Sequence, residues 1–173
     1  EVEGRAQLNL RNYDAAIGAF RTLAEVQPQS AAAHRFLGEA YGLADKLDLA
    51  LAEARKAVDI DPKDAVSKIT LARVYMAQRD FVDARKVADE LEGQFPQDSS
   101  VADLQATIAL ADNRPEDGIT ALRRELSIAD NNLVRSRLAL RHRRDKWRDP
   151  TAQKGVSVRR VLALVLCLIS APA

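Results

Sequence analysis

Few residues in this sequence have the types and spacing that catalysis needs. The chain of 173 residues contains two histidines, His34 and His142, and one cysteine, Cys167. A lone cysteine cannot form an internal disulfide, and two distant histidines supply little for a zinc centre or a nucleophilic triad. Phosphate-binding glycine loops, HExxH and GxSxG are absent from the sequence. We therefore predict a protein that is not an enzyme, with no catalytic residue, bound metal or cofactor.

A basic run near the C-terminus is the feature best suited to an anionic ligand. Residues 1–134 carry 16 basic and 23 acidic side chains, a net charge of −7, whereas residues 135–160 carry ten basic and two acidic ones, a net charge of +8. The run from Arg141 to Arg148 includes one aromatic residue, Trp147, and could contact nucleic acid or anionic lipid. Because no nucleic-acid-binding motif surrounds it, a solvated segment is the favoured interpretation, and nucleic acid is not the expected partner.

The elements that would position any functional residues are expected to be helices. Hydrophobic residues make up 47% of the chain, which is enough for a substantial core, but aromatic residues make up only 5%. Ala, Leu, Arg, Asp and Glu dominate, and these residues favour helices over strands. The composition predicts an all-α protein.

The chain repeats itself with a period of about 34 residues. Pro28, Pro62 and Pro96 are evenly spaced at this period, and small or aromatic residues precede each proline at matching offsets. The second copy is the clearest, with Leu37, Gly38, Tyr41, Ala50, Ala54 and Ala57 before Pro62. A fourth, weaker copy runs through Ala106, Ala109, Gly118 and Leu122.

Each copy is predicted to form two packed helices. Apolar residues recur at helical spacing over 36–41 and again over 47–58. Ala50 and Ala54 lie one turn apart, which allows the paired helix to approach closely, and Pro62 ends the second helix. One helix pair cannot bury its apolar surface alone, so neighbouring pairs must stack.

These repeats resemble the tetratricopeptide repeat (TPR), in which a Leu-Gly-x-x-Tyr element and spaced alanines precede a proline. The resemblance implies a right-handed superhelical solenoid of antiparallel helix pairs over residues 1–131, with a truncated first copy and a degenerate fourth. After it we expect a capping or fifth-repeat helix at 132–141, a basic linker at 142–160 and a short apolar segment at 161–173. Residues 159–173 could contact a membrane, although the apolar segment is shorter than a bilayer span.

The resemblance also implies a groove lined by the first helix of each pair. Carrying the groove positions over to this chain gives the candidate partner-binding residues Arg5, Leu8, Asn9, Arg35, Glu39, Leu43, Ile69, Arg73, Met76, Ala77, Asp103, Thr107 and Leu110. Arg5, Arg35 and Arg73 could form a ladder for carboxylates, because guanidinium offers a bidentate fork. The alternative is that these charges are paired within their own helices, as Arg35 could be with Glu39 one turn away.

The predicted function is that of a non-enzymatic scaffold that binds a protein or peptide segment in this groove, with no small-molecule substrate. The alternative is a membrane-associated or nucleic-acid-associated adaptor that uses the C-terminal residues. The third and fourth copies, with their Arg-Arg-x-Leu ending at Arg123 to Leu126, are also loosely similar to bacterial envelope TPR lipoproteins of the exopolysaccharide and exosortase (PEP-CTERM) type. That similarity implies a role in envelope or exopolysaccharide assembly, and a location in the bacterial periplasm or cell envelope.

Overall fold

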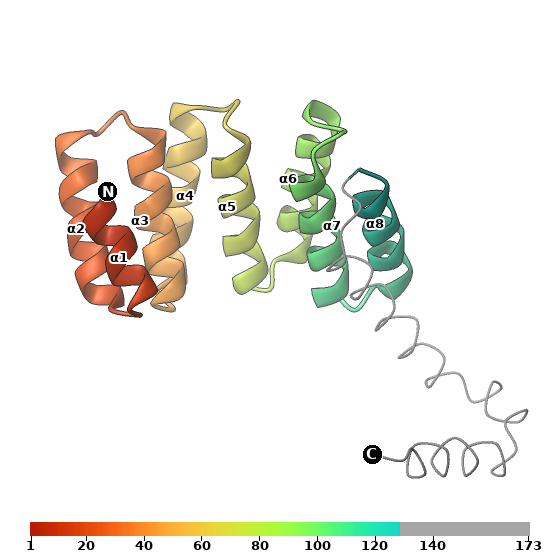
Figure 1. Cartoon of the computed structure of the whole chain (residues 1–173), viewed down its shortest axis with the longest axis horizontal. Helices are drawn as coiled ribbons and strands as arrows, with labels where there is room; N and C mark the ends of the chain where they lie inside the picture. Colours follow the sequence, from red (N-terminus) through yellow and green to blue (C-terminus); the bar gives the residue numbers. More distant parts are fainter. Residues whose placement is uncertain (129–173) are drawn as a thin grey trace, which may run out of the picture. The chain divides into compact units, whose positions relative to one another are not determined.

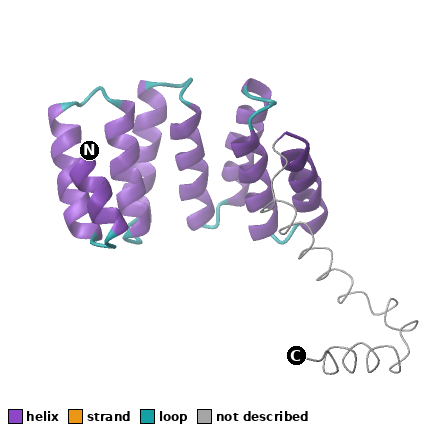
Figure 2. Ribbon diagram, viewed as in Figure 1, coloured by secondary structure: helices purple, strands orange, loops and turns teal. Residues whose placement is uncertain are grey.

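The computed structural model describes residues 1–128, which form eight helices joined by short loops (Figure 1). The helices are α1 (Val2–Asn9), α2 (Tyr13–Val26), α3 (Ala31–Leu43), α4 (Leu47–Ile60), α5 (Ala65–Ala77), α6 (Phe81–Gln94), α7 (Ser99–Ala111) and α8 (Pro115–Ile128). No strand occurs within these residues (Figure 2). The expected all-α repeat fold is therefore confirmed.

The repeat period of the sequence reappears in the backbone at the corner inside each helix pair. Arg11, Asp45, Arg79 and Asn113 occupy the same position in the four copies, and all four have a positive φ, between 56° and 62°. Each corner has the same two hydrogen bonds. In the second pair, for example, the Asp45 N–H donates to the Gly42 carbonyl and the Lys46 N–H donates to the Tyr41 carbonyl. These bonds satisfy carbonyl groups at the end of the first helix and turn the chain into the second.

Short polar side chains begin most of the helices. Asn12, Ser30, Asp64, Asp80 and Asp98 each accept a hydrogen bond from a backbone N–H in the first turn of the helix that follows. Such caps satisfy donors that have no partner within the helix. The helix boundaries are therefore encoded locally, before any packing between pairs.

Small residues allow the two helices of each pair to pack closely. Ala50 and Ala54 are fully buried, and the Gly38 backbone lies so close to α4 that a Cβ there would be 3.3 Å from the Ala50 carbonyl oxygen. In the fourth pair, a Cβ on Gly118 would lie 2.5 Å from Leu110 Cδ2. Ala106, Ala109 and Leu122 are buried too. The degenerate fourth copy thus packs as a helix pair.

The first helices of successive pairs contact one another directly, α3 with α5 and α5 with α7, and no comparable contact joins the second helices in the described part. The surface formed by α1, α3, α5 and α7 is called here the first-helix surface. The more extensive contacts between neighbouring pairs join each second helix to the next first helix, α2 to α3, α4 to α5 and α6 to α7.

The predicted segments 132–141, 142–160 and 161–173, the boundary at 131, His142 and Cys167 lie outside the described residues. Within residues 1–128, no helix has the length and hydropathy needed to cross a bilayer.

Candidate functional site

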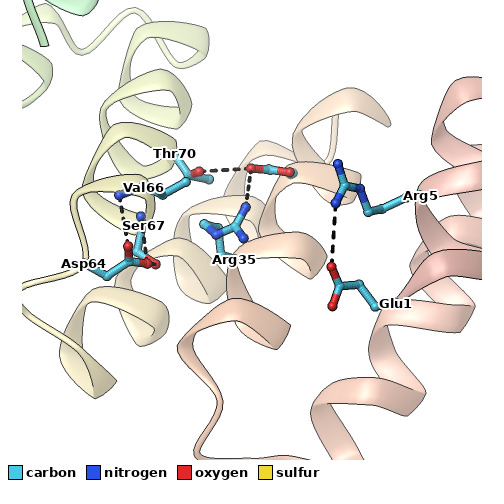
Figure 3. Close-up of polar contacts among 8 residues, drawn as sticks. Glu1, Arg5, Arg35, Asp64, Val66, Ser67 and Thr70 are labelled. Carbon is cyan, nitrogen blue, oxygen red and sulfur yellow. Dashed lines mark hydrogen bonds and ion pairs between the residues drawn. The ribbon is translucent and has the colours of Figure 1, made fainter. Parts of the chain in front are cut away.

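A polar contact between α3 and α5 lies at the centre of the first-helix surface. Arg35 Nη1 donates to Glu39 Oε1 at 3.1 Å, and Thr70 Oγ1 from α5 donates to the same oxygen at 3.2 Å (Figure 3). The predicted pairing of Arg35 with Glu39 within one helix is therefore confirmed. Glu39 also links two repeats, because it accepts hydrogen bonds from Arg35 of α3 and from Thr70 of α5.

Aromatic rings hold the Arg35 guanidinium in place. Its carbon Cζ lies 4.2 Å from the centroid of the Phe36 ring, and Phe36 stacks on Phe20 of α2 with 5.3 Å between centroids. The Arg5 guanidinium lies 5.9 Å from the same Phe36 ring. Arg35 Nε is buried and has no hydrogen-bond partner within residues 1–128. A cation between an aromatic face and a carboxylate is positioned more firmly than a freely solvated arginine.

A hollow of ≈ 500 Å³ lies between α1 and α3 and brings together several predicted groove residues. It is lined by Glu1, Arg5, Leu8, Asn9, Arg35, Phe36 and Glu39. Arg5 is mostly exposed there, and its pair with Glu1 spans 3.7 Å between two exposed side chains (Figure 3). An exposed pair of this kind contributes little stability, so Arg5 remains available to a ligand. Five of the predicted groove residues, Arg5, Leu8, Asn9, Arg35 and Glu39, therefore share one cavity.

The other candidates do not line this hollow. Arg73 is exposed on α5 and has no hydrogen bond or ion pair within the described residues. Leu43 is 55% exposed at the end of α3. Asp103 and Thr107 are half-buried on α7, and Met76 is half-buried against the core. Ile69 belongs to the hydrophobic core and is only 9% exposed, so it offers little area to a partner.

His34 is buried and makes two polar contacts within the fold. It is 3% exposed, with Nδ1 2.6 Å from Glu53 Oε2 of α4 and Nε2 3.1 Å from the Pro28 carbonyl oxygen. It thus ties α3 to α4 and to the loop that precedes α3. No group of three or more potential metal ligands occurs in the part of the chain that the structure describes.

Hydrogen bonds between an arginine and a tyrosine join the first three pairs to one another. Arg21 Nη2 of α2 donates to the Tyr41 hydroxyl at 3.0 Å, and Arg55 Nη2 of α4 donates to the Tyr75 hydroxyl at 3.0 Å. These hydrogen bonds raise the pKa of Arg21 and of Arg55 above the usual value of an arginine. Both tyrosines are at most 7% exposed.

A second hollow, of ≈ 390 Å³, lies among α6, α7 and α8, and sequence reasoning did not find it. Its lining residues are Arg85, Ala88, Asp89, Glu92, Gln105, Ile108, Ala109, Arg114, Asp117, Thr120, Ala121 and Arg124. Ala109 lies one repeat after Tyr75, at the position that holds an aromatic ring in the two preceding pairs. Alanine in place of tyrosine at this repeated position is the sequence feature that could have indicated the hollow.

The fold and its surfaces define an α-helical repeat protein built from pairs of antiparallel helices. Models of the tetratricopeptide repeat match residues 2–65 and 43–108, which together cover more than half of the chain. The chain belongs to the tetratricopeptide repeat family. Proteins of this family generally act as protein-interaction scaffolds and bind protein or peptide partners.

Solved structures share this fold at low sequence identity. The thermophilic TPR protein TTC0263 of Thermus thermophilus matches with a TM-score of 0.73 and 20% identity, over 80% of this chain and 77% of its own. PilF of Pseudomonas aeruginosa matches with a TM-score of 0.71 and 22% identity, over 83% and 66%. YrrB, described as a TPR protein with an unusual peptide-binding site, matches with a TM-score of 0.64 and 14% identity, over 76% and 68%. No curated protein matches the sequence.

Proposed function

We propose that this protein is a non-enzymatic scaffold that binds a segment of a partner protein on the first-helix surface, at the hollow between α1 and α3. One observation carries the proposal: Arg5, Asn9, Arg35 and Glu39, from two different helices, line one cavity. Five of the seven residues that line the hollow are polar or charged, and two, Leu8 and Phe36, are apolar, which suits a polar peptide segment. The peptide-binding site described for YrrB, which has the same fold, supports a peptide as the ligand.

The expected partner segment carries a carboxylate. Arg5 can turn from its weak pair with Glu1 toward a ligand, and Arg73 is an exposed cation on the same surface. Arg35 is already paired with Glu39, so its role is to position Glu39 and Phe36 rather than to bind the carboxylate itself. This arrangement favours recognition of an acidic peptide over a small-molecule substrate.

Site-specific photocrosslinking tests the surface. A photoreactive residue at Asn9 should capture the partner, whereas the same residue at Val82, which is 68% exposed on the second helix α6, should not. Equal capture at both positions would contradict the proposal. The captured partner is then purified, and its affinity for defined variants is measured.

The affinity measurement uses two variants with the same change in net charge. Arg5→Glu with Arg73→Glu should weaken binding about tenfold or more, because two cations on the first-helix surface become anions. Lys86→Glu with Arg123→Glu changes two exposed cations on the second helices α6 and α8 and should leave affinity within about twofold. Similar losses in both variants would indicate a general charge effect and would overturn the assignment of this surface.

We further propose that the partner and the protein belong to the bacterial envelope, in exopolysaccharide assembly, which the loose similarity of the third and fourth copies to envelope lipoproteins supports. Fractionation of source cells should then find the chain with the envelope, and recovery from the cytosol alone would contradict this location. The charge asymmetry favours one second candidate, an adaptor that uses the tail. In that case deletion of residues 141–173 would abolish binding to anionic vesicles or nucleic acid.

A further inference from the structure

The junction between the third and fourth helix pairs differs from the two before it at the position of one buried ring. In the earlier junctions, Tyr41 or Tyr75 fills the space between a second helix and the next first helix, and an arginine donates to its hydroxyl. At the equivalent positions of the last junction the chain has Ala109 in place of the tyrosine and Asp89 in place of the arginine. The last junction therefore lacks both the tyrosine and the arginine of the earlier hydrogen bond.

The surrounding positions of this junction have changed from apolar to polar. Leu51, Val58 and Leu71 of the preceding junction pack in or against the hydrophobic core. Their equivalents, one repeat later, are Arg85, Glu92 and Gln105. The helices keep their order and lengths, so the space that the ring would occupy is retained as the hollow of ≈ 390 Å³.

Small and apolar residues, Ala88, Ile108, Ala109 and Ala121, form part of the wall of this hollow. Its volume is well above the ~150 Å³ of an apolar cavity that holds benzene. It therefore has room for one aromatic side chain, the same group that the chain itself places at the two earlier junctions.

Of the carboxylates that line the hollow, one has no ion pair within residues 1–128. Arg85 Nη1 pairs with Asp112 Oδ2 at 2.6 Å and Arg114 Nη2 pairs with Asp117 Oδ2 at 2.5 Å. Arg124 pairs with Glu92. Asp89 has no ion pair within the described residues.

Its one hydrogen bond within residues 1–128 is marginal: Gln105 Nε2 donates to Asp89 Oδ1 over 3.4 Å. With every arginine of the hollow paired, the site favours a ligand that donates to a carboxylate. A phenol group combines that donor with the ring that the space accommodates.

We propose that the hollow among α6, α7 and α8 binds a tyrosine side chain presented by a partner protein. The ring packs on Ala88, Ile108 and Ala109, and the hydroxyl donates to the Asp89 carboxylate. This interaction reverses the direction of the hydrogen bond found at the earlier junctions, where an arginine donates to the tyrosine hydroxyl. The site goes beyond the function proposed for the first-helix surface, with which it shares no lining residue.

The first test uses the full chain with N-acetyl-tyrosinamide as the probe, followed by amide chemical shifts. We expect a Kd on the order of 1 mM for this small probe, with the largest shifts at Asp89, Ala109 and Ala121. N-acetyl-phenylalaninamide should bind at least about threefold more weakly because it has no hydroxyl to donate. The absence of shifts at these residues, equal affinity for both probes, or tighter binding of N-acetyl-argininamide would each overturn the proposal.

The second test exchanges the features of two junctions. Asp89→Arg with Ala109→Tyr restores the pattern of the earlier junctions, and it should raise Tm by a few degrees and abolish the shifts around residue 109. Tyr75→Ala opens an equivalent space one repeat earlier, and the tyrosine probe should raise the Tm of this variant more than that of the unmodified chain. The proposal would be overturned if the double variant still bound the probe. It would also be overturned if the probe did not raise the Tm of the Tyr75→Ala variant. Crosslinking through Asn9 tests the first-helix surface separately, so either hypothesis can fail without the other.

Discussion

The junctions among the first three helix pairs and the junction before the fourth pair use the same backbone with different side chains. In the former, a buried tyrosine and an arginine join α2 to α3 and α4 to α5, with apolar neighbours around them. In the latter, three arginine–carboxylate pairs surround a hollow among α6, α7 and α8. Local caps and corners are equally regular in both regions.

The fourth pair therefore keeps the repeat architecture although the junction before it has different side chains. Gly118 and Leu122 keep the small and apolar positions that hold α7 against α8. Residues at the junction are free to change from apolar to charged while the next pair still stacks. A repeat protein can thus acquire a binding site at a junction without losing its architecture.

The largest expected effect comes from removing a junction tyrosine. Tyr75→Ala should lower the free energy of unfolding by about 3–5 kcal/mol, because a buried ring and a hydrogen bond to Arg55 are lost together. Urea unfolding measures this loss. Tyr13→Ala, at the half-buried start of α2, is the matched control and should cost clearly less. Equal losses at both tyrosines would show that the junction ring has no special role.

Exchange between an apolar and a charged residue should change the free energy of unfolding more at a regular junction than at the last junction. Val58→Glu places a carboxylate against the core at a regular junction and should cost about 2 kcal/mol of stability. The reverse change at the equivalent position, Glu92→Val, removes a partly exposed ion pair with Arg124 and should alter stability by less than about 1 kcal/mol. Thermal and urea unfolding measure both variants. Equal changes in stability for Val58→Glu and Glu92→Val would mean that the two junctions do not differ in this way.

Substitution of glycine by alanine should cost more stability where the added Cβ meets backbone atoms than where it meets a side chain. A Cβ at Gly38 would lie 3.3 Å from backbone atoms of Ala50 and Ala54, which cannot move aside, so Gly38→Ala should cost about 1 kcal/mol. At Gly118 the added Cβ meets Cδ2 and Cγ of the Leu110 side chain, at 2.5 and 2.9 Å, so this side chain must rotate away, and the helix propensity of alanine offsets part of the cost. Chemical denaturation of the two variants should show the larger loss at Gly38.

Gly93→Ala is the control for this pair of substitutions, because nothing lies within 4 Å of its added Cβ. It should stabilise the chain by about 0.5–1 kcal/mol through helix propensity alone. A loss of stability at Gly93, or a greater loss at Gly118 than at Gly38, would contradict this interpretation.

Salt should have the smallest effect, and it should be greatest at the last junction, where more ion pairs occur than at the junction of Lys46 with Asp14. About 1 M NaCl shortens the Debye length to ~3 Å and weakens the partly exposed pairs of Arg85 with Asp112 and Arg124 with Glu92, by roughly 0.5 kcal/mol in total. Amide hydrogen exchange in α8 should become faster relative to exchange in α4. Equal changes in both helices would mean that ion pairs do not hold the fourth pair.

The fold of residues 1–128 could be predicted from the sequence. The repeat period places the second helices at Tyr13, Leu47, Phe81 and Pro115, and the small residues indicate which helix faces approach closely. These features are local: caps, corners and residue volumes act over a few residues, so they can be read along the chain. The pairing of Arg35 with Glu39 was predictable for the same reason, since both lie on one helix.

The sharing of a cavity by particular side chains could not be predicted, because it depends on how the helices pack. Arg5 and Asn9 meet Arg35 and Glu39 because α1 lies near α3, and Ile69 is buried because neighbouring helices cover it. The hollow around Ala109 likewise depends on α6, α7 and α8 converging on a space that no side chain of the repeat fills. Burial depends on the distance between helices far apart in sequence, and a periodic pattern of residue types does not specify that distance.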